Sequence, residues 1–141
     1  MARIQINLPS EFIFSADIPI RIGDIDGVHL GYGSFFSFLS EARTRFFRSL
    51  GYTDLGDING TAIILTDVSI VYLKQGYYGQ TLRVDIAANN FTSKGFDMVY
   101  RISDAETGVE MARAKTGLLF YDYQQQKVTT IPLDFRKKFS N

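Results

Sequence analysis

The chain of 141 residues contains no cysteine, and this absence excludes several classes of protein. A disulfide framework, a thiolate metal site and a cysteine nucleophile all need that side chain. Only one histidine is present, so we expect no metal centre either. Candidate catalytic groups are therefore sought among carboxylates, the single histidine and backbone N–H groups.

The chain also lacks a net charge and a long apolar run. Lys and Arg number 15, as do Asp and Glu, so no overall field favours nucleic acid or an anionic membrane. No apolar run approaches the length of a bilayer span, and the first residues, MARIQINLPSEF, do not resemble a signal peptide. We therefore expect a soluble, cytoplasmic protein with no nucleic-acid partner and no membrane insertion.

No repeat, low-complexity segment or linker divides the sequence, so we expect a single domain over residues 1–141. The chain is long enough to bury a sizeable core. Its 12 Phe and 8 Tyr suit such a core or an apolar ligand slot.

One stretch, from Arg21 to Tyr52, organises the rest of the chain. It predicts the end of a strand, a short loop from Gly23 to Leu30, and one long helix that starts near Gly31 and ends at Gly51. An apolar stripe with helical spacing covers roughly 180° of that helix, which favours a concave sheet wrapped around it. Its members are Phe35, Phe38, Leu39, Ala42, Phe46 and Leu50, extended by Phe36 and Phe47.

Strand-like segments flank the helix. Residues Glu11–Ile22 alternate apolar and polar side chains, and Pro19 within them indicates an edge position or a bulge. The later segments are strands at Thr61–Lys74, Thr81–Phe91, Phe96–Ile102 and Val109–Tyr123, a polar hairpin-like tail at Gln124–Lys127, and a short helix at Pro132–Phe139. This order predicts an α+β domain with one helix packed against one antiparallel sheet.

Several of these segments together resemble the hotdog-fold acyl-CoA thioesterases, and most of all the 4-hydroxybenzoyl-CoA thioesterase-like family. The resemblance spans roughly residues 15 to 138. It rests on Asp24-Ile25-Asp26, His29, Glu41-Ala42-Arg43, Leu50-Gly51, Ile70-Val71-Tyr72-Leu73-Lys74, Tyr78-Gly79, Ser93-Lys94-Gly95-Phe96 and Ala112-Arg113-Ala114-Lys115-Thr116. The resemblance implies an antiparallel sheet around one long helix, and a homodimer or homotetramer with acyl-CoA bound at the subunit interface. It implies no cofactor beyond the coenzyme A of the substrate.

Thioester hydrolysis needs a group that attacks or activates water and a donor that stabilises charge on the carbonyl oxygen. A carboxylate before a helix and the free N–H groups at the helix start can supply both. By resemblance to the family, Asp26 is the catalytic general base or nucleophile and the Tyr32 backbone N–H polarises the carbonyl. An aspartate in such a loop is also a common turn-former or cap, and Asp24 is expected to hold the loop.

The single histidine, His29, falls where the family often carries a histidine, although a lone loop histidine is usually solvated or locally bonded. The glycine that precedes the family's histidine is missing, and the spacing from Asp26 to the helix is one residue shorter than the common pattern. Gly31 stands where the family often has asparagine. Tyr32 is a further departure, because some members have histidine there.

The resemblance also suggests binding residues. Ser93 and Lys94 match positions that contact coenzyme A, though the same residues are ordinary hairpin composition. Phe35 or Phe36 could line an acyl slot. The helix arginines are expected to form a solvated or interface face; they are Arg43, Arg45 and Arg48.

Three functions remain open from the sequence. The leading one is a thioesterase that hydrolyses acyl-CoA, with acyl-carrier-protein thioesters as a second carrier. The others are a non-catalytic acyl-CoA-binding protein and an enoyl-CoA hydratase, for which the histidine and carboxylate would have to shuttle protons.

Overall fold

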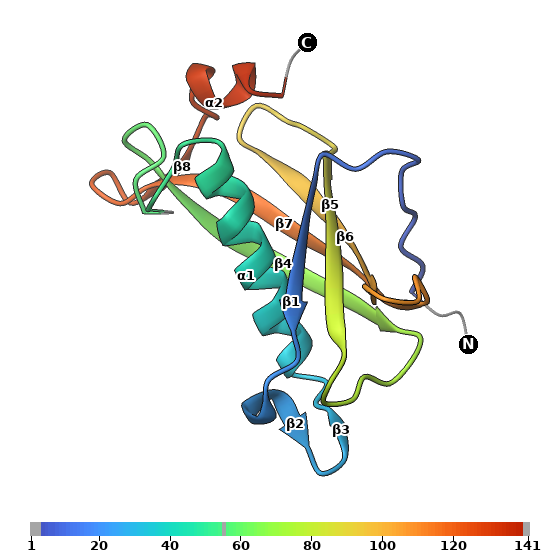
Figure 1. Cartoon of the computed structure of the whole chain (residues 1–141). Helices are drawn as coiled ribbons and strands as arrows, with labels where there is room; N and C mark the ends of the chain where they lie inside the picture. Colours follow the sequence, from blue (N-terminus) through green and yellow to red (C-terminus); the bar gives the residue numbers. More distant parts are fainter. Residues whose placement is uncertain (1–3, 55, 140–141) are drawn as a thin grey trace.

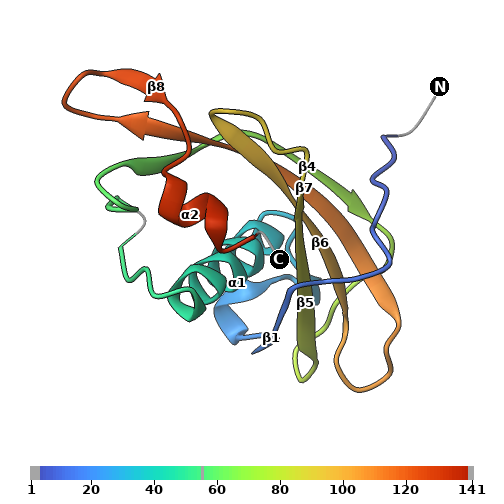
Figure 2. The ribbon, with the colours of Figure 1, turned by 90° about the horizontal axis from the view of Figure 1, so that it is seen from above.

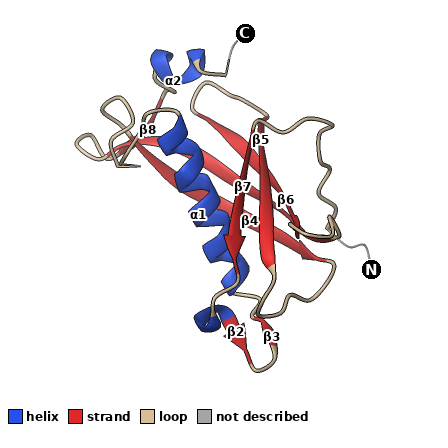
Figure 3. Ribbon diagram, in the orientation of Figure 1, coloured by secondary structure: helices blue, strands red, loops and turns tan. Residues whose placement is uncertain are grey.

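The computed structural model describes residues 4–54 and 56–139 and shows a curved antiparallel sheet wrapped around one long helix (Figures 1 and 2). The helix, α1, runs over Ser34–Ser49. The strands are β1 (Phe14–Pro19), β4 (Ala62–Tyr72), β5 (Thr81–Asn89), β6 (Gly95–Asp104), β7 (Glu110–Asp122) and β8 (Lys127–Thr129). Their order is β1-β5-β6-β7-β4, with β8 paired to β7 (Figure 3). The predicted α+β architecture is confirmed; positions 1–3, 55, 140 and 141 of the predicted domain lie outside the described residues.

The first strand is shorter than the alternation predicted. Within β1, Ala16 and Ile18 are buried beneath α1, whereas Ser15 and Asp17 point outward from the other face. Pro19 is the last residue of β1 and β1 is an edge strand, as the proline indicated. Ile22, the last apolar residue of the predicted alternation, does not continue the strand: it is 73% exposed, because the chain turns into a short 3-10 helix, η1 (Ile22–Asp24), after the proline.

The helix stripe is confirmed except at one position. Phe36 is 46% exposed, so the sheet covers a narrower face of α1 than the sequence suggested. Six stripe residues are fully buried and Leu50 is half-buried. The buried ones are Phe35, Phe38, Leu39, Ala42, Phe46 and Phe47.

Arg43 is also buried, which corrects the expectation of a solvated arginine. Its guanidinium donates hydrogen bonds to the Tyr100 hydroxyl (3.1 Å) and to Ser40 Oγ (3.2 Å). The Tyr100 hydroxyl is itself 2.8 Å from Thr116 Oγ1. A buried polar network between helix and sheet therefore replaces the water that the arginine was expected to meet.

The C-terminal end of α1 packs against the last helix of the chain, through the rings of Phe47 and Phe135. Gly51 follows the helix with φ +97°, the left-handed conformation that glycine adopts at low cost, as predicted. The terminal helix α2 (Leu133–Lys137) is shorter than expected, with Pro132 preceding it as the cap. The predicted hairpin-like tail is the turn between β7 and β8. Neither helix of the described residues is long and apolar enough to cross a membrane.

Candidate active site

The segment between β1 and α1 was expected to be a loop, but most of it is ordered as regular structure. After η1 come two short strands, β2 (Ile25–Asp26) and β3 (His29–Leu30), which pair as a hairpin beside the N-terminal end of α1 (Figure 1). Gly27 has φ +73° in the turn between them. The pairing sets Asp26 directly opposite His29, so the two candidate side chains belong to one rigid unit.

Asp24 anchors this unit, as predicted. Its carboxylate is buried and accepts hydrogen bonds from the Arg21 backbone N–H (2.8 Å) and from the Arg21 guanidinium. Its carbonyl oxygen accepts from Ser34 Oγ (2.9 Å) and from the Gly31 N–H (3.0 Å). The Asp24 carboxylate therefore bonds Arg21, and the Asp24 carbonyl joins the hairpin to the start of α1.

Asp26 differs from Asp24 in every one of these respects. It is exposed, and its carboxylate has no hydrogen bond or ion pair within the described part of the chain. Its side chain lies against the helix start, because a Cβ added to Gly31 would be 3.3 Å from Asp26 Cβ. The structure thus leaves one aspartate unpartnered among the described residues, beside Gly31, which precedes the first residue of α1, Ser34, by three positions.

Two backbone N–H groups near Asp26 also have no hydrogen-bond acceptor among the described residues. The helix start is closed by bonds from Ser34 to the Gly31 carbonyl and from Phe35 to the Tyr32 carbonyl. The Tyr32 and Gly33 N–H groups precede these bonds, and among residues 4–54 and 56–139 neither finds an acceptor. They are N–H donors at the positive end of the helix dipole, next to an unpartnered carboxylate.

Aromatic side chains flank these groups. The Tyr32 ring is 59% exposed and lies 4.7 Å from the Tyr72 ring and 6.3 Å from the His29 ring, between centroids. His29 Nδ1 lies 3.0 Å from the Leu30 carbonyl oxygen and donates to it in the tautomer protonated there. Burial raises the pKa of the Tyr72 phenol, with a smaller contribution from Tyr32.

Comparison with known proteins identifies the family of the chain. The family model of the thioesterase-like superfamily matches residues 20–139, which is most of the chain. The chain belongs to the thioesterase-like superfamily.

Solved structures show the same fold. A 1,4-dihydroxy-2-naphthoyl-CoA thioesterase from Synechocystis is 23% identical, with a TM-score of 0.81 over 88% of this chain and 93% of that one. The PA2801 protein from Pseudomonas aeruginosa is 23% identical, with a TM-score of 0.83 over 92% and 100%. A Staphylococcus aureus protein solved in complex with CoA is 14% identical, with a TM-score of 0.83 over 95% and 85%. A search of curated sequences gave no match. The hotdog fold expected from the resemblance is confirmed.

The two phenylalanines that were expected to line an acyl slot differ in their exposure to solvent. Phe35 is buried in the core and its ring lies 5.2 Å from that of Tyr72, whereas Phe36 is largely exposed. With Tyr32 and Tyr72, which is 39% exposed, Phe36 belongs to the exposed aromatic residues at this end of α1 and β4. Tyr72 was not singled out as a site residue from the sequence, whereas the Gly33 N–H was among the helix-start amides, Gly31 to Gly33, that were expected to be free; of these, the Gly31 N–H is bonded to the Asp24 carbonyl.

The expected coenzyme A residues do not meet Asp26 within one chain. Ser93 and Lys94 are exposed in the turn between β5 and β6, which lies beside α2 at the other end of the molecule (Figure 1). The turn is held by bonds from the Ile131 N–H to the Ser93 carbonyl (2.9 Å) and from the Phe120 N–H to the Lys94 carbonyl (3.0 Å). These bonds use the backbone and leave both side chains directed to solvent.

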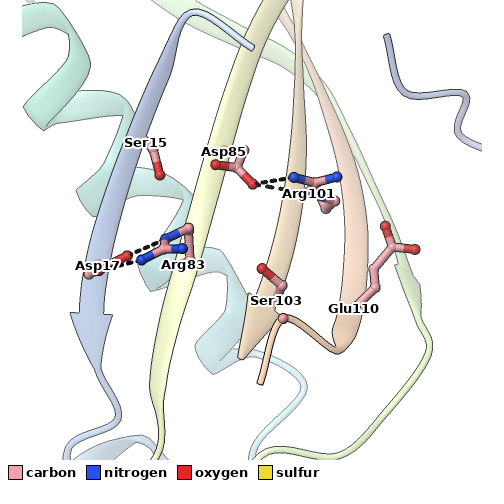
Figure 4. A pocket seen from close by; sticks show the side chains of 8 residues that line it. Ser15, Asp17, Arg83, Asp85, Arg101, Ser103 and Glu110 are labelled. Carbon is pink, nitrogen blue, oxygen red and sulfur yellow. Dashed lines mark hydrogen bonds and ion pairs between the residues drawn. The ribbon is translucent and has the colours of Figure 1, made fainter. Parts of the chain in front are cut away.

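A depression of about 840 Å³ lies away from this site, on the outer face of the sheet (Figure 4). Its charged groups are all paired: Arg83 with Asp17 (2.9 Å), Arg101 with Asp85 (3.0 Å), and Glu110 with Arg113 outside the depression (2.9 Å). The bond from Arg83 lowers the pKa of the Asp17 carboxyl. These paired groups have little left to offer a substrate, so we assign no chemistry to the depression. No group of three or more metal-ligating side chains occurs in the described residues.

Proposed function

We propose that the protein is an acyl-CoA thioesterase that releases a free acid and CoA in the cytoplasm without a further cofactor. One observation carries the proposal: the Asp26 carboxylate, which has no partner among the described residues, lies against Gly31, next to the Tyr32 and Gly33 N–H groups that have no acceptor there. Membership of the thioesterase-like superfamily supports the reaction class.

The arrangement supports a simple reaction. The thioester carbonyl oxygen would accept a hydrogen bond from the Tyr32 N–H, which stabilises negative charge as the carbonyl carbon is attacked. Asp26 would take a proton from the attacking water, and as the carbon–sulfur bond breaks this proton would pass to the departing thiolate of CoA. Alternatively, Asp26 would attack the carbonyl carbon itself and expel CoA as the thiolate, and water would then cleave the resulting anhydride, releasing the free acid, restoring the Asp26 carboxylate and supplying the proton for the thiolate. His29 lies opposite Asp26 in the hairpin and would assist Asp26 in the proton transfer.

The assembly we propose is a homodimer or homotetramer with the site at a subunit interface. Strand β4 is an edge of the sheet along its 11 residues, and Leu65 and Tyr72 on it are 46% and 39% exposed. A long open edge of this kind is usually paired or covered. Antiparallel pairing of β4 with a second copy would bring the Ser93–Lys94 end of the partner to the same end of the joined sheet as Asp26. This would let Ser93 and Lys94 contact the CoA phosphates while Phe36, the exposed member of the Phe35–Phe36 pair, faces the acyl group.

The test is thiol release from a panel of acetyl-, hexanoyl-, palmitoyl- and benzoyl-CoA, for the wild type and Asp26→Asn. The protein has no cysteine, so a thiol reagent reads CoA alone. We expect turnover by the wild type and a loss of about 10²- to 10⁴-fold in Asp26→Asn, the range for removal of a general base. Asp57→Asn is the matched control, because Asp57 is an exposed loop aspartate that bonds only the Gly60 N–H.

The other outcomes identify the rival functions. Turnover that survives in Asp26→Asn would move the carboxylate role to another residue. A melting temperature raised by CoA, with no hydrolysis of any thioester, would identify an acyl-CoA-binding protein. Loss of the enoyl chromophore of crotonyl-CoA without thiol release would identify a hydratase.

A further inference from the structure

A hydroxyl from the sheet reaches the backbone at the helix start. Tyr72, the last residue of β4, donates a hydrogen bond from its hydroxyl to the Tyr32 carbonyl oxygen at 3.0 Å. The same oxygen accepts the longer helical bond from the Phe35 N–H, at 3.3 Å. The phenol therefore makes the shorter of the two contacts that hold this carbonyl.

The carbonyl of Tyr32 belongs to the peptide group that also carries the Gly33 N–H. A peptide group is planar and trans, so fixing its oxygen also fixes the direction of its N–H, on the opposite side. Donation to the oxygen further polarises the group and strengthens the N–H as a donor. The Tyr72 hydroxyl thus acts on one of the two unpaired N–H groups described above without touching it.

The phenol is well held for this task. Its ring packs against those of Tyr32 and Phe35, at 4.7 and 5.2 Å between centroids. These contacts fix the ring between an exposed residue of the site and a core residue of α1. Tyr77, by contrast, is an exposed tyrosine whose hydroxyl donates only to the side chain of Gln75, two residues away.

We propose that Tyr72 is a positioning residue of the thioester site: its hydroxyl orients the Tyr32–Gly33 peptide so that the Gly33 N–H joins the Tyr32 N–H as a second donor to the carbonyl oxygen. The inference rests on the proposed thioesterase function. It adds a donor and a residue from β4 to a site otherwise built from the hairpin and the start of α1. No new covalent step is involved, because Tyr72 only holds the donor in place.

The test is Tyr72→Phe, which keeps the ring and removes the hydroxyl. Loss of a whole donor of this kind lowers kcat by about 10²- to 10³-fold, so loss of its orientation should lower kcat by roughly tenfold. KM should stay within about twofold, because the donor acts more strongly on the transition state than on the bound thioester. Tyr77→Phe, the matched control, should leave both constants unchanged.

A spectroscopic readout separates orientation from general loosening. The probe is the ketone analogue of the best substrate in the panel, with methylene in place of the thioester sulfur and ¹³C at the carbonyl. Binding to the wild type should move the carbonyl ¹³C signal downfield, and Tyr72→Phe should lose part of that movement at equal occupancy. Tyr77→Phe should retain all of it.

The outcomes distinguish this inference from the proposed function. If the wild type hydrolyses no thioester, the proposed function fails and the inference fails with it. If the wild type is active but Tyr72→Phe retains its kcat and the full ¹³C shift, the inference alone is overturned. A rise in KM with unchanged kcat would also overturn it, since that pattern describes a substrate contact.

Discussion

The two ends of α1 are built for different purposes. At the C-terminal end, the Phe135 ring of α2 closes the space between helix and sheet and lies 5.0 Å from Phe120, 5.1 Å from Phe139 and 5.9 Å from Phe47, between centroids. At the N-terminal end, the neighbouring rings of Tyr32 and Tyr72 are exposed to solvent. One end is sealed by buried aromatic area, and the other keeps its aromatic side chains open to a ligand or a partner.

The backbone shows the same contrast. At the C-terminal end, the Leu50, Gly51 and Tyr52 N–H groups all bond helical carbonyls. At the N-terminal end, the Tyr32 and Gly33 N–H groups have no acceptor in the part of the chain that the structure describes. Every α-helix leaves its first N–H groups without a helical acceptor, and because Tyr32 and Gly33 are exposed, their N–H groups are accessible to a ligand. The comparison assigns stability to one end and binding to the other.

The largest effect should come from opening the sealed end. Phe135→Ala removes a fully buried ring and should lower the free energy of unfolding by about 3–5 kcal/mol, as measured by urea denaturation. The kcat of the folded protein should change less than about threefold, because the deletion lies at the far end of α1 from Asp26. Leu133→Ala on the same helix is the control: Leu133 is 67% exposed, and its truncation should cost within about 0.5 kcal/mol. A cost for Phe135→Ala no greater than this would show that the end is not sealed.

The sealed end and the sheet were readable from the sequence because their signals are local and periodic. The stripe on α1 repeats every three or four residues, and the strands alternate with a period of two. Pro19 indicated an edge strand and Gly51 the end of the helix, each through a backbone restriction that acts within one or two residues. The error at Phe36 has a related cause, since periodicity shows which side of a helix is apolar but not how far a sheet extends over it.

The open end could be predicted only in part. Asp24 and Asp26 look alike in the sequence, and the structure separates them through the bonds that Asp24 makes with Arg21 and Ser34. Tyr72 touches Tyr32 across 40 residues of chain, through a hydroxyl and a backbone oxygen. No spacing rule reports such a contact, so the role of Tyr72 could not be assigned from the sequence.

Arg43 shows the same limit in the core. Its partner, Tyr100, is 57 residues away in the sequence, and only the folded sheet brings that hydroxyl beneath the helix. A charged residue flanking an apolar stripe is therefore solvated or buried according to a partner that the local pattern does not contain.

An intermediate effect should follow from crowding the open end. The Cβ in Gly31→Ala would lie 3.3 Å from Asp26 Cβ and 3.5 Å from Ser34 Oγ, so the Asp26 side chain must move by a few tenths of an ångström. Because a misplacement of about 1 Å can cost 10²-fold, we expect kcat to fall roughly three- to tenfold. Gly23→Ala is the control, since its added Cβ meets no atom within 4 Å. Equal kcat values in the two variants would mean that Asp26 is not held in place at Gly31.

The smallest effect should distinguish the tyrosines at the two ends. Tyr52, at the sealed end, packs on Phe135 (5.7 Å) and donates to Asn59 Oδ1 (2.8 Å). Burial raises the pKa of the Tyr52 phenol, with a further rise from Asp134, and burial also raises the pKa of Tyr72. A raised pKa means that folding favours the neutral phenol. The stabilisation is complete below the unfolded value, about 10, and is lost as the pH rises through the folded value.

Tyr52→Phe should therefore lower the free energy of unfolding by about 0.5 kcal/mol at neutral pH, because it loses one exposed hydrogen bond. Above pH 10 its stability should decline less steeply than that of the wild type, as measured by urea denaturation at intervals between pH 8 and 11. Tyr72→Phe should flatten the alkaline decline in the same way, yet only Tyr72→Phe should also lower kcat. A decline in Tyr52→Phe as steep as in the wild type would contradict the burial effect at the sealed end. A loss of kcat in Tyr52→Phe would remove the distinction between the two ends, because a phenol that only stabilises the fold has no means of orienting a donor at the other end of the helix.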